Sequence, residues 1–169
     1  MLRSYWVLVV MDQCTRRLVG FGVQCGAVTG ADACRMFNTA IYRQGVPRHL
    51  STDHDPVFEA HCWAANLRIL EIDEIKTVPH VPVSHPFVER LIGTVRREFL
   101  DQVLFWNARD LERKLAEFQV YYNAARRHAS LDGHTPLSFG AGGTVATADL
   151  RHVRWVSHCR DLVQLPVAA

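Results

Sequence analysis

The chain has 169 residues, a formal net charge of +2 and an apolar fraction of 49%, which is enough for one domain with a sizeable core. The balanced charge gives no sign of a highly basic nucleic-acid-binding body. Five cysteines without a CxxC pair indicate reduced thiols rather than a disulfide framework, and the nine histidines show no spacing typical of a zinc site.

The first apolar run, residues 5–11, is too short to cross a membrane and lacks a small-residue cleavage site, so we expect neither a membrane span nor a signal peptide. Together with the reduced thiols, this predicts a cytoplasmic protein. The run is rich in β-forming residues and predicts a central strand that ends at Asp12. Residues 15–28 follow after a very short connection and predict one or two further strands in an antiparallel hairpin or meander.

Residues 29–45 predict a helix, because Thr29 and Asp32 resemble a capping box and an apolar stripe follows them. The expected buried positions of this stripe are Ala33, Phe37, Ala40 and Ile41. Next come a short strand over residues 48–52 that ends at Asp53, a helix over residues 57–69 and an alternating strand over residues 70–78.

A proline-rich loop, residues 79–86, precedes two long helices. The first is predicted over residues 87–103, with Val88, Leu91, Val95 and Phe99 on its apolar face. The second starts near Asn107, where Asn107 and Asp110 suggest a cap, and its stripe contains Leu111, Leu115, Phe118 and Tyr122. Residues 139–143 read as a linker, and a basic tail follows over residues 150–169. The element order predicts a mixed α/β layered protein with an antiparallel hairpin at one side.

Two aspartates, Asp12 and Asp53, each end an apolar strand, and adjacent strands would bring their carboxylates to one edge of the sheet. Such close carboxylates repel each other, and Mg²⁺, which prefers oxygen ligands, would relieve the repulsion. Glu89, in the first turn of the helix after the proline loop, is the best third ligand. At helical spacing, Gly93 and Arg96 lie on roughly the same side as Glu89. This set predicts metal-assisted phosphodiester chemistry.

Each carboxylate also has a plainer interpretation. An aspartate at a strand end is often only a turn residue, and a glutamate in the first turn of a helix often only compensates the helix dipole. Rival carboxylates occur on the predicted strand over residues 70–78, whose polar face we expect to meet solvent. They are Glu71, Asp73 and Glu74.

Three ordered blocks resemble the integrase core (DDE) transposases of bacterial insertion sequences, in the ribonuclease H-like superfamily. They are "VVMDQCTRRLVGF", "HPFVERLIGTVRREFLD" and "YYNAARRHASLDGHTP", which begin at residues 9, 85 and 121. Asp12 precedes Asp53 by 41 positions, and 35 residues separate Asp53 from Glu89, as in that family. The resemblance spans about residues 5–137.

The resemblance implies a ribonuclease H-like mixed sheet, with three antiparallel strands followed by strands that alternate with helices, two long C-terminal helices and an irregular tail. It further implies that Asp12, Asp53 and Glu89 are catalytic and bind two Mg²⁺ or Mn²⁺ ions for phosphoryl transfer on DNA. Basic residues would hold the phosphates of element ends and target DNA. These candidates are Arg90, Arg96, Arg97, Arg126, Arg127 and His128.

The sequence departs from the family at three points. No helix-turn-helix region precedes the core, so we expect a separate helix-turn-helix protein or domain to recognise the element ends. His54 and Asp55 replace a usual Asn-Gly, and we interpret them as turn residues, with Asp55 an outer-shell partner of the metals. Arg127 stands where a proline usually precedes the histidine.

We expect an integrase core over residues 1–138, and a linker and basic tail over residues 139–169.

The implied partners are DNA and further copies of the chain in a homo-oligomeric complex, with no membrane partner and with nucleoid association when DNA is bound.

One alternative function is that of a truncated, non-catalytic DNA-binding or regulatory remnant of a transposase. Another is a receiver-type signalling domain, which predicts alternating βα units instead of opening strands joined by short turns. A third is a plain ribonuclease H-like nuclease that hydrolyses RNA–DNA hybrids without joining DNA.

Overall fold

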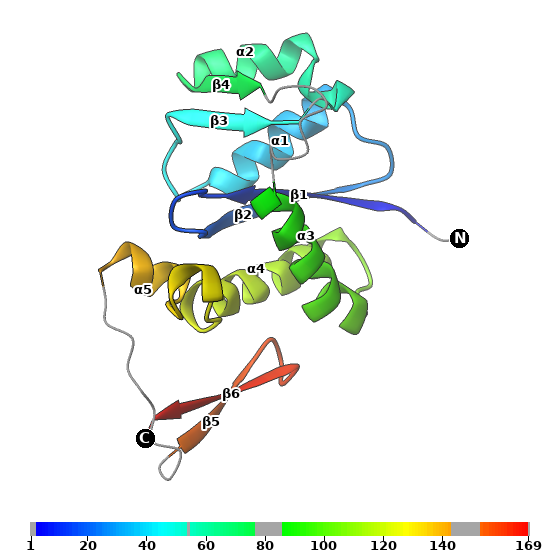
Figure 1. Cartoon of the computed structure of the whole chain (residues 1–169). Coiled ribbons are helices and arrows are strands. Elements are labelled where there is room, and N and C mark those ends of the chain that lie inside the picture. Colours follow the sequence, from blue (N-terminus) through cyan, green and yellow to red (C-terminus); the bar gives the residue numbers. More distant parts are fainter. Residues whose placement is uncertain (1–2, 54, 77–85, 143–152, 169) are drawn as a thin grey trace. The chain divides into compact units, whose positions relative to one another are not determined.

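A computed structural model describes the chain except residues 1–2, 54, 77–85, 143–152 and 169 (Figure 1). The chain divides into two compact units. The first consists of Met1–Val10 and Val19–Leu91, and the second of Met11–Leu18 and Ile92–Ala169. The predicted boundary between residues 138 and 139 falls inside the second unit and stays a prediction.

The first unit begins with strands β1 (Tyr5–Met11) and β2 (Leu18–Cys25), whose ends extend into the second unit. Further along are α1 (Gly30–Ile41), β3 (His49–Thr52), the 3-10 helix η1 (Pro56–Phe58), α2 (His61–Ile69) and β4 (Asp73–Lys76). The helix α3 (Pro86–Glu98) starts in this unit and ends in the second. The second unit continues with η2 (Leu100–Gln102), α4 (Ala108–Ala124), η3 (Ala129–Leu131), α5 (Pro136–Gly140), β5 (Val153–His158) and β6 (Val163–Ala168).

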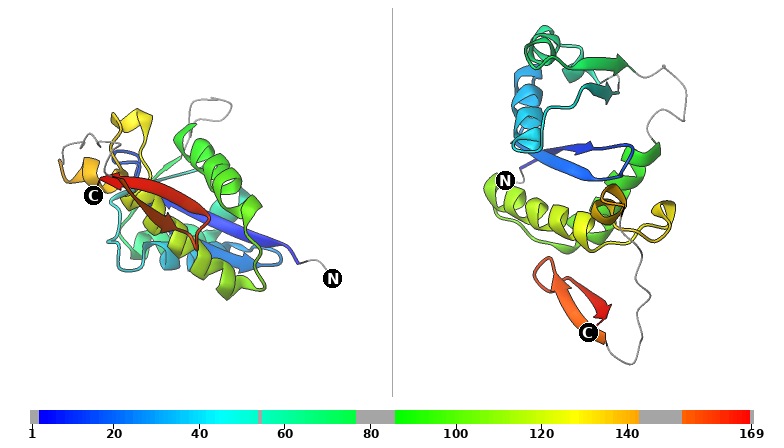
Figure 2. Two further views of the ribbon diagram at one scale, coloured as in Figure 1. Left: turned by 90° about the horizontal axis from the view of Figure 1, so that it is seen from below. Right: turned by 90° about the vertical axis from the view of Figure 1, so that its left-hand side faces the viewer.

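The helix α1 forms where its sequence signals place it. Thr29 accepts a hydrogen bond from the Asp32 amide, and the Asp32 carboxylate accepts one from the Thr29 amide, which confirms the capping box. The predicted stripe is buried, and the core of the first unit is built from Ala33, Phe37, Ile41, Trp63, Leu67 and Ile72. In this core α1 packs against α2 (Figure 2). Phe37 is edge-on to Trp63, with 5.4 Å between the ring centroids.

Two glycines allow β2 to approach α1 closely. A Cβ on Gly20 would lie 2.1 Å from the Ala40 carbonyl oxygen, and one on Gly22 would lie 2.4 Å from Cβ of Met36. Any larger residue would collide with the helix, so these positions require glycine.

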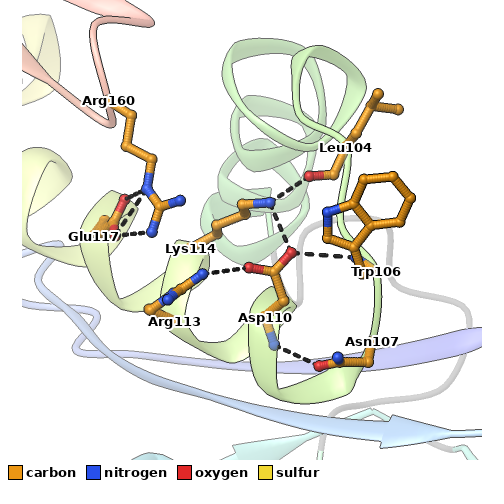
Figure 3. Close-up of polar contacts among 8 residues, drawn as sticks. All are labelled: Leu104, Trp106, Asn107, Asp110, Arg113, Lys114, Glu117 and Arg160. Atoms are coloured by element: carbon orange, nitrogen blue, oxygen red, sulfur yellow. Dashed lines mark hydrogen bonds and ion pairs between the residues drawn. The ribbon is translucent and has the colours of Figure 1, made fainter.

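The start of α4 is held by a polar cap at residues 104–114 (Figure 3). Asn107 Oδ1 accepts a hydrogen bond of 2.9 Å from the Asp110 amide, as predicted. Asp110 in turn accepts bonds from Arg113 and Lys114 at 2.7 and 2.8 Å. The Lys114 bond is the main cause that lowers the pKa of Asp110 to about 2, so this carboxylate is ionised beside the positive end of the helix. Lys114 also donates to the Leu104 carbonyl.

The strand prediction was partly wrong. In the part of the chain that the structure describes, β1 and β2 are the strands that precede α1, not three antiparallel strands. Asp12 to Arg17 form the connection and leave room for one strand in residues 15–28. The pair β3 and β4 is parallel and β5 and β6 are antiparallel. The strands in the described residues thus form three two-stranded sheets, and the single mixed sheet is not confirmed.

The prediction of an irregular tail was wrong, because β5 and β6 form a hairpin. Its turn uses left-handed backbone at Cys159, Arg160 and Asp161, with φ of 52°, 57° and 66°. Arg160 donates to Glu117 on α4 at 2.8 Å (Figure 3). The His158 ring lies 5.5 Å from that of Tyr121. The hairpin is therefore attached to α4. The predicted helix over residues 87–103 also ends early, at Glu98, where the 3-10 turn η2 takes over.

Candidate functional site

Asp12 lies directly after β1, in the connection to β2. Its carboxylate accepts a hydrogen bond of 2.9 Å from the Cys14 amide and one of 2.5 Å from the Thr15 hydroxyl. Partial burial raises the pKa of Asp12, but these bonds and the Arg17 charge outweigh burial, and the net pKa lies below the ordinary value. Asp12 is therefore an ionised carboxylate held in one orientation.

Asp53 follows the last residue of β3, and its side chain is exposed. Its Oδ1 accepts a hydrogen bond of 3.3 Å from the Asp55 amide. Asp55 plays a different part: it is the N-cap of η1, where its Oδ1 accepts a bond of 3.0 Å from the Val57 amide. This is the geometry of a turn residue, as predicted for Asp55, whereas His54 lies outside the described residues.

Glu74 on β4 has a role that the sequence did not reveal. Its Oε1 accepts a hydrogen bond of 2.8 Å from the Thr52 hydroxyl and another of 3.1 Å from the Trp63 indole nitrogen. The neighbouring Asp73 side chain is 74% exposed and faces His49. Glu74 therefore points inward and joins β3, β4 and α2, contrary to the expectation that it meets solvent.

Glu89 lies in the first turn of α3, where its side chain is exposed. Three further side chains of this helix are exposed and cationic: Arg90, Arg96 and Arg97. A Cβ on Gly93 would lie 3.2 Å from Nη1 of Arg97, so the Arg97 guanidinium lies over the bare backbone at Gly93. The helix thus presents one carboxylate and three cations to solvent.

The closing segment, residues 121–136, supplies internal contacts instead. Arg126 donates to both oxygens of Glu98 at 2.8 and 2.6 Å. The His128 ring is buried edge-on against Tyr122 at 4.7 Å, and burial, assisted by the Arg126 charge, lowers the pKa of His128 to about 4. Arg127 is exposed and donates to the Gly133 carbonyl at 3.3 Å. Of the three predicted phosphate-binding residues here, two have partners within the protein that favour a structural role.

Asn123, in the same segment, is also buried and pairs with the backbone of Leu18. Its Oδ1 accepts a bond of 2.9 Å from the Leu18 amide, and its Nδ2 donates to the Leu18 carbonyl at 2.8 Å. Tyr121 and Tyr122 are buried as well. The Tyr-Tyr-Asn run therefore serves packing and attaches α4 to the start of β2.

The three predicted catalytic carboxylates are distributed over both units: Asp12 belongs to the second, and Asp53 and Glu89 belong to the first. Their donor chemistry fits Mg²⁺, because all three are carboxylates and Asp12 is held ionised. Across the described part of the chain, no three His, Cys, Asp or Glu side chains are grouped so that they could hold a metal ion. The assignment of this triad stays a prediction.

None of the helices in the described residues is long and apolar enough to cross a bilayer.

Comparison with known proteins finds similarity to one family over part of the chain. A family model described as an integrase core domain matches residues 70–136, a range that includes Glu89 and the closing segment. The insertion element IS476 uncharacterized 39.2 kDa protein of Xanthomonas euvesicatoria is 29% identical over 134 residues. This alignment covers 79% of the chain but 38% of the relative, so the chain spans well under half the length of that protein.

Solved structures with the same fold are retroviral integrases. The HTLV-2 integrase catalytic core domain in complex with magnesium has a TM-score of 0.58 at 20% identity, over 80% of this chain and 84% of that one. The BIV integrase core has a TM-score of 0.58 at 21% identity, over 84% and 91% of the two chains. A chain of the simian T-cell lymphotropic virus intasome has a TM-score of 0.63 at 18% identity, over 89% and 55%. These likenesses establish the fold, and the resemblance seen in the sequence is confirmed.

Proposed function

On the premise that this chain carries an integrase core domain of the insertion-element kind, we propose that it cuts and joins DNA by metal-assisted phosphoryl transfer. The observation that carries the proposal is the match to the integrase core family model over residues 70–136, a range that includes Glu89. Asp12 and Asp53 precede this range, and their spacing from Glu89 follows the family pattern. Water would be the nucleophile that nicks an element end, and the freed 3′-hydroxyl would then attack target DNA.

In this proposal Asp12, Asp53 and Glu89 hold two divalent ions, Mg²⁺ or Mn²⁺. When bound, such ions activate an attacking oxygen and stabilise the leaving oxygen. The protein supplies positioning: Thr15 and the Cys14 amide keep the Asp12 carboxylate oriented and ionised, and Asp53 is left exposed at the end of its strand. The HTLV-2 integrase core is in complex with magnesium, which supports the choice of ion.

The exposed cations of α3 are the proposed phosphate contacts. Arg90, Arg96 and Arg97 lie on the same helix as Glu89 and are exposed to solvent. Replacing Arg96 by alanine should weaken binding to every DNA sequence and reduce the slope of log affinity against log salt by about 0.9 for the lost contact. Arg126→Ala should instead lower stability, because it breaks the Glu98 pair.

The decisive experiment compares two neighbouring aspartates. Duplexes that carry the ends of the element would be incubated with the full chain and Mn²⁺, and nicking and joining would be measured on gels. We expect Asp53→Asn to abolish both steps and Asp55→Asn, the matched control, to retain them, because an asparagine at position 55 still caps η1. Equal activity of wild type and Asp53→Asn would refute the catalytic assignment and favour a non-catalytic DNA-binding remnant.

The proposed partners follow from the same relationship. The simian virus neighbour is part of an intasome, and HTLV-2 core domains have dimeric and trimeric forms. We propose that this chain likewise acts as a homo-oligomer on element ends and target DNA, with end recognition by a helix-turn-helix protein or domain. Light scattering with and without end duplexes tests the oligomer.

A further inference from the structure

Glu74 on β4 accepts hydrogen bonds from both β3 and α2, and this three-way junction includes Thr52, the residue directly before Asp53. The Thr52 hydroxyl and the Trp63 indole both donate to Oε1 of Glu74, at 2.8 and 3.1 Å. Thr52 is the last residue of β3 and is 7% exposed, and Trp63 is 1% exposed at the centre of the core. One carboxylate oxygen therefore connects the end of β3 to the buried core of the first unit.

The register of the sheet explains why Glu74 can reach Thr52. In the parallel pair β3 and β4, Leu50 is the direct partner of Glu74. Thr52 lies two residues further along β3 and so is on the same face of the sheet as Leu50, within reach of a long side chain. That face is the inner one, because Leu50 packs against the core cluster that contains Trp63.

The junction also fixes the direction of the next side chain. Successive side chains of an extended chain point to opposite faces, so a hydroxyl pinned on the inner face sets the rotation of the backbone at Thr52. By this alternation we expect the Asp53 side chain on the opposite face, and Asp53 is indeed exposed. Trp63 has a single N–H donor, which needs an acceptor when it is buried, so the core itself holds Glu74 in place.

We infer that Glu74 is a positioning residue for the Asp53 carboxylate, acting through Thr52, and not a metal ligand itself. This inference rests on the proposed function, because it assigns Glu74 a part in presenting Asp53 to a divalent cation. Asp73, one residue earlier, takes no part in the junction, since it is exposed and faces His49.

The test measures Mn²⁺ binding to the full chain without DNA, by electron paramagnetic resonance of the free ion. The variants are Glu74→Ala, Glu74→Gln, Thr52→Val and Thr52→Ser, with Asp73→Ala as the matched control on the same strand. We expect Glu74→Ala and Thr52→Val to raise the Mn²⁺ dissociation constant roughly 10-fold, the loss typical of an outer-shell partner. Glu74→Gln and Thr52→Ser keep the acceptor oxygen and the donor hydroxyl, so they should bind Mn²⁺ like the wild type, as should Asp73→Ala.

A second readout separates positioning from loss of folded protein. Misfolding would reduce nicking by the same factor at every metal concentration, whereas a displaced Asp53 shifts the Mn²⁺ concentration for half-maximal nicking and is rescued by excess metal. Thr52→Val, which keeps Glu74 and its bond to Trp63, provides the test even if Glu74→Ala does not fold.

Two negative results have different meanings. If Asp53→Asn weakens Mn²⁺ binding but Glu74→Ala and Thr52→Val do not, the inference is overturned and the proposed function stands. The inference is likewise overturned if Glu74→Gln binds as poorly as Glu74→Ala, because the charge and not the junction would then matter. If Asp53→Asn itself binds Mn²⁺ like the wild type, the proposed function fails.

Discussion

Replacing Asn123 by alanine should destabilise the second unit by roughly 2–4 kcal/mol, because both hydrogen bonds to the Leu18 backbone are lost and a buried N–H is left without an acceptor. Among the described residues, Asn123 Oδ1 is the acceptor for the Leu18 amide, at 2.9 Å, and Leu18 is fully buried. The Leu18 carbonyl retains Gln119 Nε2 at 3.2 Å, so the unsatisfied group is the amide.

The assay is urea unfolding followed by circular dichroism, combined with hydrogen exchange of the Leu18 amide. Val120→Ala, at a position on the same helix that is 67% exposed, is the control and should change stability by less than about 0.5 kcal/mol. Asn123→Asp keeps the acceptor but presents a second oxygen to the Leu18 carbonyl, so it should rescue little. An Asn123→Ala variant that retains both stability and slow Leu18 exchange would refute the reasoning.

Three further changes probe the cap, the buried histidine and the glycine contact. Because the pKa of His128 falls from 6.5 to about 4 on folding, the unfolded chain takes up the proton first, so stability should decline as the pH falls from 6.5 to 4. His128→Phe should remove this component, roughly 2–3 kcal/mol, from urea unfolding curves across that range. Asn107→Ala removes the α4 cap and should cost about 1 kcal/mol in the same assay at pH 7. Gly22→Ala places a Cβ 2.4 Å from Met36 and should cost roughly 1–3 kcal/mol in thermal melts, whereas Gly140→Ala, with its nearest contact at 3.5 Å, should be near neutral.

Local signals predicted the helices well, because caps and apolar stripes depend on residues three or four positions apart. Thr29 with Asp32 and Asn107 with Asp110 cap the helices at which they were expected. The C-terminal hairpin escaped prediction for an equally local reason. Its turn places three non-glycine residues in left-handed backbone, from Cys159 to Asp161, so no Gly or Asn-Gly signal marks it. The β-branched and aromatic residues in the run 153–158 were the available sign.

The residues of the candidate site were proposed from the sequence, and that assignment stays a prediction, whereas the contacts around them could not be proposed. Spacing selects Asp12, Asp53 and Glu89 without any knowledge of their neighbours. In contrast, the inward orientation of Glu74 depends on which face of β4 is covered by α2, and alternation alone cannot decide between Asp73 and Glu74. The Thr52–Glu74 bond joins residues on separate strands, and such pairings depend on the register of the sheet.

The basic residues of α3 and of the closing segment, residues 121–136, fall into two groups according to what their side chains contact. Arg126 has both Nε and Nη2 on Glu98 and its Nη1 3.3 Å from His128, so recruiting it to a phosphate would break a bidentate pair and expose a buried ring. Arg96 and Arg97 are exposed, and among the described residues no such pair would be broken by moving them onto DNA. A phosphate contact gains only what exceeds the cost of the bonds it replaces. If the chain binds DNA as proposed, its phosphate contacts should therefore lie on α3, and the closing segment should hold the second unit together.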